Sequence, residues 1–274
     1  NEIMSTFLQF RISRDAVSRL YNNLNKQNSS TSLKFNTVQR NDLLFKSIKL
    51  DNVDFIYPNS NYSALSGINL EINSGESIGF IGASGSGKTT LIDILLGLLT
   101  PKKGSVTLNN KLLQEQVRVW HENVAYLPQE VFLVDNTLAC NIALGVDSSD
   151  IDYSKLKLAI SKANLTDLVE RLPEGLETRL GERGARISGG QRQRVALARA
   201  FYFERSVLIM DEATSALDTA TEFEINEEIK LLKGTITIIV IAHRLSTVKS
   251  CDRIYKMERG RIVSFGSSKE ILDN

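Results

Sequence analysis

Residues 77–90 read SIGFIGASGSGKTT, and this stretch decides the fold. Its second part, residues 82–89, fits the pattern G-x-x-x-x-G-K-[ST] of a phosphate-binding P-loop. The apolar run SIGFI before the loop is typical of a buried strand. The apolar run TTLIDILLGLL after it predicts a helix that is stopped by Thr100 and Pro101. A strand, a glycine-rich loop and a helix in this order predict a site for the phosphates of a nucleotide.

The glycines of this loop allow consecutive backbone N–H groups to point at one phosphate. Lys88 adds a positive charge, and the N-terminus of the following helix adds a favourable dipole. The Thr89 hydroxyl is predicted to bind Mg²⁺. The predicted phosphate-binding residues are Gly82, Ser84, Gly85, Ser86, Gly87, Lys88, Thr89 and Thr90.

An acidic pair follows a second apolar run, VLIMDE at residues 207–212. We expect Asp211 to hold Mg²⁺ through water and Glu212 to accept a proton from the attacking water. Two solvated carboxylates at a strand end are the alternative, which the nearby P-loop disfavours. Because the sequence has no N-K-x-D motif for reading guanine, these motifs predict a nucleoside triphosphatase or kinase other than a GTPase.

Composition excludes several classes of protein. Lys and Arg number 33 against 32 Asp and Glu, so the net charge of +1 gives no strong field for nucleic acid. Cys140 and Cys251 lack CxxC spacing, and only His121 and His243 accompany them, so we expect no structural metal site and a reducing compartment. No apolar run approaches the roughly 18 residues of a membrane span, and no signal peptide is recognisable, which predicts a soluble polypeptide.

The chain divides at about residue 45. Apolar residues recur at helical spacing over residues 3–24, and a polar, linker-like stretch follows up to residue 44. This part is predicted to be either a surface helix or a helical stem that continues from an upstream segment, which would make the chain a fragment. From residue 45 to 274, strands and helices alternate. The pattern predicts an α/β P-loop NTPase (RecA-like) core, with an antiparallel β subdomain in front and an inserted α-helical subdomain at about residues 130–195.

A second stretch, RISGGQRQRVALARA at residues 186–200, has the composition of another anion site. Ser188 is expected to begin a helix, and Gly189 and Gly190 leave its first N–H groups uncovered. Taken with the P-loop, these residues resemble the nucleotide-binding domain of ATP-binding-cassette (ABC) transporters over about residues 46–274. Residues 187–191, ISGGQ, correspond to the family signature L-S-G-G-Q, with Ile in place of Leu.

Other motifs follow in the order and spacing of that family. Tyr57 in DFIYP resembles the aromatic residue that stacks on adenine, and Gln129 in YLPQE resembles the glutamine that senses Mg²⁺ and the attacking water. SALD, ending at Asp218, resembles the D-loop, and His243 resembles the histidine that contacts the γ-phosphate. Each residue alone is more typical of packing or a solvated surface; their joint occurrence favours the functional interpretation. The resemblance thus implies catalytic Glu212, His243 and Gln129; metal-binding Thr89, Gln129 and Asp211; and nucleotide-binding Tyr57, Ser188, Gly189, Gly190, Gln191 and Asp218 beside the P-loop.

The resemblance also implies how two such sites work. In this family two domains pair head to tail, and ATP lies between the P-loop of one and the signature of the other. The expected cofactors are ATP and Mg²⁺, and the expected partners are a second copy and a transmembrane domain, without nucleic acid. Hydrolysis would remove the shared ligand and loosen the pair.

Two stretches are similar to exporters within the family. Residues 178–184, TRLGERG, match the exporter pattern except at Arg179, where exporters usually carry Glu. Residues 128–145 also follow an exporter pattern. The resemblance then implies that the stem is the cytoplasmic end of a membrane helix, and that the ATPase works at the cytoplasmic face of the inner (plasma) membrane. FRISRDAVSRLYNNL is most similar to bacterial flippases for lipid-linked oligosaccharides, although lipid A and peptide exporters stay open.

Two rival functions are an ABC-type ATPase that acts on nucleic acid and a regulatory module that binds ATP without hydrolysing it. The first would carry long coiled coils, a second cassette or zinc-binding cysteines, none of which occurs in this sequence. Lys88, Asp211, Glu212 and His243 are all present, which argues against the second.

Overall fold

The structure is a computed structural model that describes residues 44–272 except 59, 212, 214–218 and 242–244. The predicted N-terminal stem therefore lies outside the described residues, apart from its last position. Within the described part, two sheets and a set of helices surround two hydrophobic cores.

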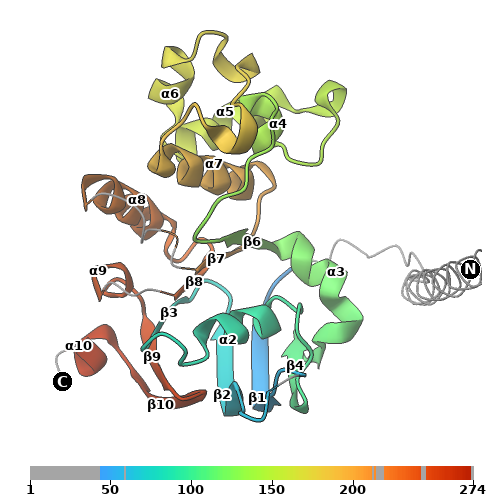
Figure 1. Ribbon diagram of the computed structural model, residues 1–274, viewed down its shortest axis with the longest axis vertical. Helices are drawn as coiled ribbons and strands as arrows, with labels where there is room; N and C mark the ends of the chain where they lie inside the picture. The colour runs from blue at the N-terminus through green and yellow to red at the C-terminus, as the bar shows by residue number, and fades with distance from the viewer. Residues whose placement is uncertain (1–43, 59, 212, 214–218, 242–244, 273–274) are drawn as a thin grey trace, which may run out of the picture. The chain divides into compact units, whose positions relative to one another are not determined.

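The central sheet has six strands in the order β10-β9-β3-β8-β7-β6 (Figure 1). The five strands β9, β3, β8, β7 and β6 are parallel, and β10 is antiparallel to β9. Every residue of β7 and β8 is buried, as the continuous apolar runs predict for parallel strands covered on both faces. The strands are β3 (Ser77–Ile81), β6 (Val124–Leu127), β7 (Val207–Asp211), β8 (Thr237–Ile241), β9 (Arg253–Glu258) and β10 (Arg261–Gly266).

The second sheet is antiparallel and has the order β2-β1-β4-β5. Its strands come mostly from the part of the chain before and just after the P-loop. In β2, buried and exposed positions largely alternate, as in a sheet with one face in a core and one in solvent. The strands are β1 (Ser47–Phe55), β2 (Leu65–Asn73), β4 (Lys103–Leu108) and β5 (Lys111–Leu112).

The helices of the predicted inserted subdomain are shorter than the sequence indicates. The part predicted to be an α-helical subdomain, at about residues 130–195, forms mainly short helices separated by turns and 3₁₀ segments. These elements are α4 (Leu138–Ile142), η2 (Ser148–Asp150), α5 (Tyr153–Lys162), α6 (Thr166–Arg171), η3 (Gly175–Glu177) and η4 (Glu182–Gly184), and α7 (Gly189–Tyr202) follows them. The remaining helices are α2 (Lys88–Leu95), α3 (Leu113–Asn123), α8 (Thr219–Leu232), α9 (Leu245–Val248) and α10 (Ser268–Leu272).

The two faces of the central sheet belong to different cores. Successive side chains of a strand point to opposite faces. On β7, Val207 and Ile209 join the core that contains α2 and the antiparallel sheet. Leu208 and Met210 join the other core, which contains α4, α5 and α7. The P-loop helix α2 and the signature helix α7 therefore cover opposite faces of one sheet, as Figure 1 shows.

Helix α2 ends earlier than predicted. The sequence indicates a helix that reaches Thr100, but α2 stops at Leu95. Gly97 adopts a left-handed conformation (φ 74°), and the N–H groups of Gly97 and Leu98 donate to the carbonyls of Ile94 and Asp93 (3.0 and 2.8 Å). This pair of bonds is a Schellman motif, which terminates the helix before Pro101 can act.

The expected fold class is confirmed: an α/β P-loop NTPase core with an antiparallel β subdomain and a helical part. The antiparallel hairpin β9–β10 forms one edge of the central sheet. Within the residues that the structure describes, no helix has the length and apolar character needed to cross a bilayer.

Candidate functional site

The register of the parallel strands brings the predicted site residues to one edge of the sheet. Phe80 on β3 pairs with Ile241 on β8, and Ile241 also pairs with Asp211 on β7. On the neighbouring strand β6, Leu127 pairs with Met210. The P-loop, the acidic end of β7 and the segment after β6 therefore begin at the same level. Ligands of open α/β sheets bind at this carboxyl edge.

The P-loop is held from outside by two other segments. The N–H group of Gly260, in the β9–β10 turn, donates to the carbonyl of Ser86 (2.9 Å). Gly87 is the N-cap of α2 with φ 101°, and a Cβ there would lie 2.7 Å from the carbonyl oxygen of Ala64. Only glycine fits this position, because it tolerates both the positive φ and the close backbone. Gly87 also has no side chain with which to cover the first N–H groups of α2.

Lys88 lies within the loop rather than in solvent. Its side chain is 5% exposed, and its ammonium group donates to the carbonyls of Gly82 (2.8 Å) and Ala83 (3.0 Å). A buried ammonium needs such partners to offset its desolvation. The loop therefore fixes the position of the positive charge that the sequence assigned to phosphate binding.

The other predicted loop residues divide into exposed and buried groups. Ser84, Gly85 and Thr89 are exposed, so their backbone and hydroxyl groups are open to a ligand. Ser86 is buried, and within the described part of the chain its hydroxyl has no hydrogen-bond partner. Thr90 is also buried, and its hydroxyl contacts the Tyr57 hydroxyl. A phosphate at this loop would meet the exposed groups first.

Tyr57 lies beside the P-loop helix. Its hydroxyl is 3.2 Å from Thr90 Oγ1, and its ring packs edge to face on Phe55 at 5.0 Å. The side chain is 41% exposed, so part of the ring remains open for stacking. This placement suits the predicted contact with a nucleotide base.

Asp211 ends β7 and is 8% exposed. The Tyr126 hydroxyl on β6 donates to Asp211 Oδ2 (3.2 Å). Burial and the neighbouring Asp211 carboxylate raise the pKa of Tyr126 well above its usual value, so the phenol stays protonated as a donor. Thr89, Gln129 and Asp211 all offer oxygen ligands from this end of the fold, and a hard cation such as Mg²⁺ requires oxygen ligands. Their chemistry fits the predicted metal.

Gln129 lies two residues beyond β6 and is exposed. Glu212 directly follows β7, and His243 follows β8 by two positions, but both lie outside the described residues, as does Asp218. The catalytic roles assigned to Glu212, His243 and Gln129 stay predictions.

Helix α7 begins at Ser188, as predicted from the sequence. Ser188 Oγ accepts from the Gln191 N–H (3.3 Å), and the Ser188 N–H donates to Gln191 Oε1 (2.8 Å), which together form a capping box. The side chains of Ser188 and Gln191 therefore bond to the backbone of the signature itself. Because this cap uses Ser188 Oγ as an acceptor, its hydroxyl hydrogen remains a donor. The sequence predicted uncovered N–H groups at Gly189 and Gly190, but Gly189 is half-buried and Gly190 is buried, whereas Ser188 itself is exposed.

The exporter-like residues before the signature pack on the segment after Gln129. Thr178 is 2% exposed, and its carbonyl accepts from the Leu138 N–H (3.0 Å). Gly184 lies against Leu133, because a Cβ at Gly184 would be 2.5 Å from Leu133 Cδ1. Residues 178–184 thus connect the signature to the segment after β6. Arg179, the position that departs from the exporter pattern, is exposed.

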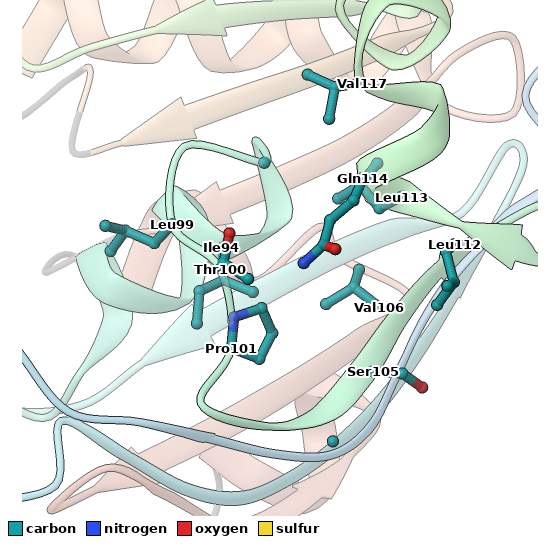
Figure 2. Close-up of a pocket in the computed structure, with 12 residues that line it drawn as sticks. Ile94, Leu99, Thr100, Pro101, Ser105, Val106, Leu112, Leu113, Gln114 and Val117 are labelled. Carbon is teal, nitrogen blue, oxygen red and sulfur yellow. The ribbon is translucent and has the colours of Figure 1, made fainter. Parts of the chain in front are cut away.

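A cavity of about 250 Å³ lies at the other end of α2 from the P-loop (Figure 2). Ile94, Leu99, Pro101 and Val106 line it, and the Gln114 amide points into it. It is distinct from the nucleotide site, because the P-loop precedes the first turn of α2 while this cavity adjoins the last turn.

Sequence reasoning missed the residues that support the site. Tyr126 contacts the carboxylate that is predicted to bind metal, and the P-loop lies against Gly260 of the β9–β10 turn and Ala64, which precedes β2. The only sequence signal for Tyr126 is its position in the same short motif as Gln129. Trp120 and His121 lie at the other end of α2, away from the carboxyl edge of the sheet. Trp120 Nε1 donates to the Leu95 carbonyl, and His121 Nε2 contacts the Leu96 carbonyl.

Comparisons with known proteins agree with this geometry. A family model described as "ABC transporter" matches residues 65–215. The chain is 40% identical over 228 residues to the ATP-dependent lipid A-core flippase of Ralstonia nicotianae, covering 82% of this chain and 38% of that protein. It is 43% identical over 227 residues to the flippase of the same name from Chromobacterium violaceum, with the same two coverages.

A solved structure gives the same result. The bacterial Atm1-family ABC exporter with ATP bound matches with a TM-score of 0.76 and 33% sequence identity. The match covers 84% of this chain and 40% of that exporter. The chain thus spans about two-fifths of the length of the proteins it matches.

Proposed function

The chain belongs to the ABC transporter family, and we propose that it binds and hydrolyses ATP between two copies of itself paired head to tail. The P-loop of one copy holds the triphosphate, and the signature of the other contacts the γ-phosphate. The observation that carries this proposal is the placement of α2 and α7 on opposite faces of one sheet. Because the two helices lie on opposite faces, this placement supports contact between the signature of one molecule and the nucleotide on the P-loop of a second molecule.

The electrostatics of the two helix starts support a paired site. A helix N-terminus contributes roughly 0.3–1 kcal/mol to anion binding when exposed, and up to about 2 kcal/mol when partly buried. The start of α7 alone is therefore too weak to hold ATP. It adds the exposed Ser188 hydroxyl and the positive end of its helix to a phosphate that Lys88 and the loop already hold. Closure of the pair then depends on the γ-phosphate.

The residues at the carboxyl edge carry the hydrolysis step in this proposal. Mg²⁺, held by Thr89, Gln129 and Asp211, would offset the charge of the phosphates. Tyr126 keeps the Asp211 carboxylate oriented. Glu212 takes a proton from the attacking water, and His243 contacts the γ-phosphate. When the γ-phosphate leaves, the signature loses its ligand and the pair opens.

We further propose that this chain powers a flippase that moves a lipid or a lipid-linked oligosaccharide. The support is the name that the curated relatives share, ATP-dependent lipid A-core flippase. The proposal includes a transmembrane domain as partner and a location at the cytoplasmic face of the inner membrane. ATP hydrolysis in vesicles that contain lipid A should exceed hydrolysis in vesicles without it, and equal rates would contradict this substrate.

The variant Glu212→Gln tests the hydrolytic role. General-base catalysis contributes about 10²–10⁴-fold, so the variant should lose roughly that factor in kcat and keep its ATP affinity. Glu258→Gln, an exposed pair with Lys256, is the matched control and should hydrolyse ATP normally. Near-normal hydrolysis by Glu212→Gln in the natural full-length protein would contradict the assignment.

A further inference from the structure

Residues 129–137, between β6 and α4, are held by one buried amide, and we call them the Gln129 segment. Asn141 is 0% exposed, and its Oδ1 accepts from the Val134 N–H (3.0 Å). Its Nδ2 donates to the carbonyls of Val134 (3.0 Å), Asn136 (3.3 Å) and Thr137 (3.0 Å). Four bonds to one side chain leave this segment little freedom relative to α4. Its conformation therefore follows the position of α4.

Arg199 on the signature helix binds this same assembly. Its Nε donates to the Asn141 carbonyl (2.7 Å), and its Nη2 donates to the Phe132 carbonyl (2.9 Å). Phe132 lies three residues after Gln129, and Arg199 is three turns along the helix that Ser188 begins. One guanidinium thus joins α7 both to the Gln129 segment and to α4.

The environment of Arg199 is unusual for a surface arginine. Burial lowers its pKa to about 10, so it remains charged at neutral pH. Among the described residues, no carboxylate forms an ion pair with it. Its donors are matched to backbone carbonyls in a rigid fork, which lysine cannot reproduce. The desolvated guanidinium of Arg199 therefore links α7 to the Gln129 segment.

We propose that Arg199 is a positioning residue for ATP hydrolysis, which holds the Gln129 segment at a fixed offset from the signature helix. Gln129 acts on the nucleotide bound to its own chain, and Ser188 acts on the nucleotide of the second copy. Movement of α7 when Ser188 meets a γ-phosphate is therefore transmitted through Arg199 to the Gln129 segment. This inference rests on the proposed function.

The proposal predicts a specific kinetic signature. In the described part of the chain, the hydrogen bonds of Arg199 go to the Asn141 and Phe132 carbonyls and not to the P-loop or Tyr57. ATP affinity should therefore be unchanged when Arg199 is replaced. The turnover step should slow, because small displacements of catalytic groups cost up to about 100-fold in rate. A residue that only stabilised the fold would lower the apparent kcat in proportion to the folded fraction, so kcat is expressed per ATP-binding site counted in the titration.

Arg205 offers a matched control. It also donates a guanidinium N–H to a backbone carbonyl, that of Glu122, and burial also lowers its pKa. It lies beyond the C-terminus of α7 and stacks on Phe203 at 5.2 Å. Among the described residues, its hydrogen bond and ring contact go to Glu122 and Phe203 and not to the Gln129 segment. Replacing it removes a similar interaction from the same region without breaking the proposed link.

The experiment compares Arg199→Met, Arg199→Lys and Arg205→Met in the natural full-length protein. Steady-state hydrolysis gives kcat, equilibrium titration gives the Kd for ATP, and thermal unfolding reports folding. Arg199→Met should lower kcat about 10–100-fold with Kd within twofold of wild type. The kcat of Arg199→Lys should lie between those of wild type and Arg199→Met, because lysine keeps the charge and loses the forked geometry of the guanidinium. Arg205→Met should keep kcat within twofold.

The outcomes separate this proposal from the proposed function. If Arg199→Lys, or a folded Arg199→Met, turns over within twofold of wild type, the positioning role is wrong while ATP hydrolysis stands. An equal loss in Arg205→Met would also overturn it, because the effect would then be general to buried arginines. If Arg199→Met fails to fold, Arg199→Lys decides. A wild-type protein that does not hydrolyse ATP contradicts the proposed function itself.

Discussion

The starts of α2 and α7 are built from similar residues and behave differently. Both carry serine and glycine before a helix, and both present N–H groups suited to an anion. At α2 the N-cap is Gly87, which has no side chain, and the loop already contains the ammonium group of Lys88. At α7 the Ser188–Gln191 capping box satisfies the helix start from within.

This difference indicates which of the two sites can bind a phosphate without a second molecule. The P-loop contacts Ala64, which precedes β2, and Gly260 of the β9–β10 turn, and it holds the ammonium group of Lys88 within the loop. The signature has no lysine within the motif, and its exposed donor is the Ser188 hydroxyl at a helix start where Gly190 is buried. We therefore interpret α2 as the primary phosphate site and α7 as a contact that is useful only when another molecule supplies the phosphate.

The largest effect should come from the P-loop. Lys88→Met removes the positive charge, and loss of one such preorganised donor costs about 10²–10³-fold. Both ATP affinity and hydrolysis should fall by at least about 100-fold. Nucleotide titration and phosphate release measure the two effects. Lys111→Met, on the exposed strand β5, should change neither. Normal ATP affinity in Lys88→Met would break the comparison, since α2 would not be the primary site.

A second effect should appear at the signature, in hydrolysis alone. Ser188→Ala removes the hydroxyl, so kcat should fall about 100-fold while ATP affinity stays within twofold. The lost N-cap should also lower the free energy of unfolding by about 1 kcal/mol. Asp152→Ala removes the comparable cap of α5, where Asp152 accepts from Ser154 and Lys155 N–H groups, and controls for stability. A loss of kcat in both variants would make the effect one of folding.

The smallest functional effect should come from the far end of α2. Trp120 is fully buried, and its Nε1 donates to the Leu95 carbonyl (2.6 Å). Trp120→Phe leaves that carbonyl without its donor, which should lower the free energy of unfolding by about 1–3 kcal/mol. ATP affinity should stay within twofold. Urea unfolding and nucleotide titration measure the two quantities, and a large loss of affinity would show that the P-loop depends on this end of the helix.

The sequence was sufficient where a local pattern fixes the structure. The P-loop and the start of α7 follow from glycine, serine and apolar periodicity within about fifteen residues. The end of α2 was predicted wrongly, because Pro101 is the stronger signal in the sequence but Gly97 comes first along the chain. The four-residue strand β6 is too short to give a periodic signal.

Long-range contacts were beyond sequence reasoning. Arg199 is one of several arginines in the stretch predicted to form an anion site, yet it binds carbonyls 58 and 67 positions away. Tyr126 reaches Asp211 across 85 positions. A backbone carbonyl leaves no residue-type signal, so a single sequence cannot name Arg199 as a link. The motifs name the candidate reacting groups, and the structure was needed to find what contacts the described ones.

The most direct test pairs two inactive chains of the natural full-length protein. One carries Lys88→Met and the other Ser188→Arg, both in a Glu212→Gln background, and differently tagged copies are purified as mixed pairs. Retained ATP is counted after rapid removal of free nucleotide. If the signature of one copy closes the P-loop of the other, each mixed pair keeps one intact site and should retain one ATP, while neither variant paired with itself retains any. No retention by mixed pairs, beside normal retention by pairs with Glu212→Gln alone, would contradict the account.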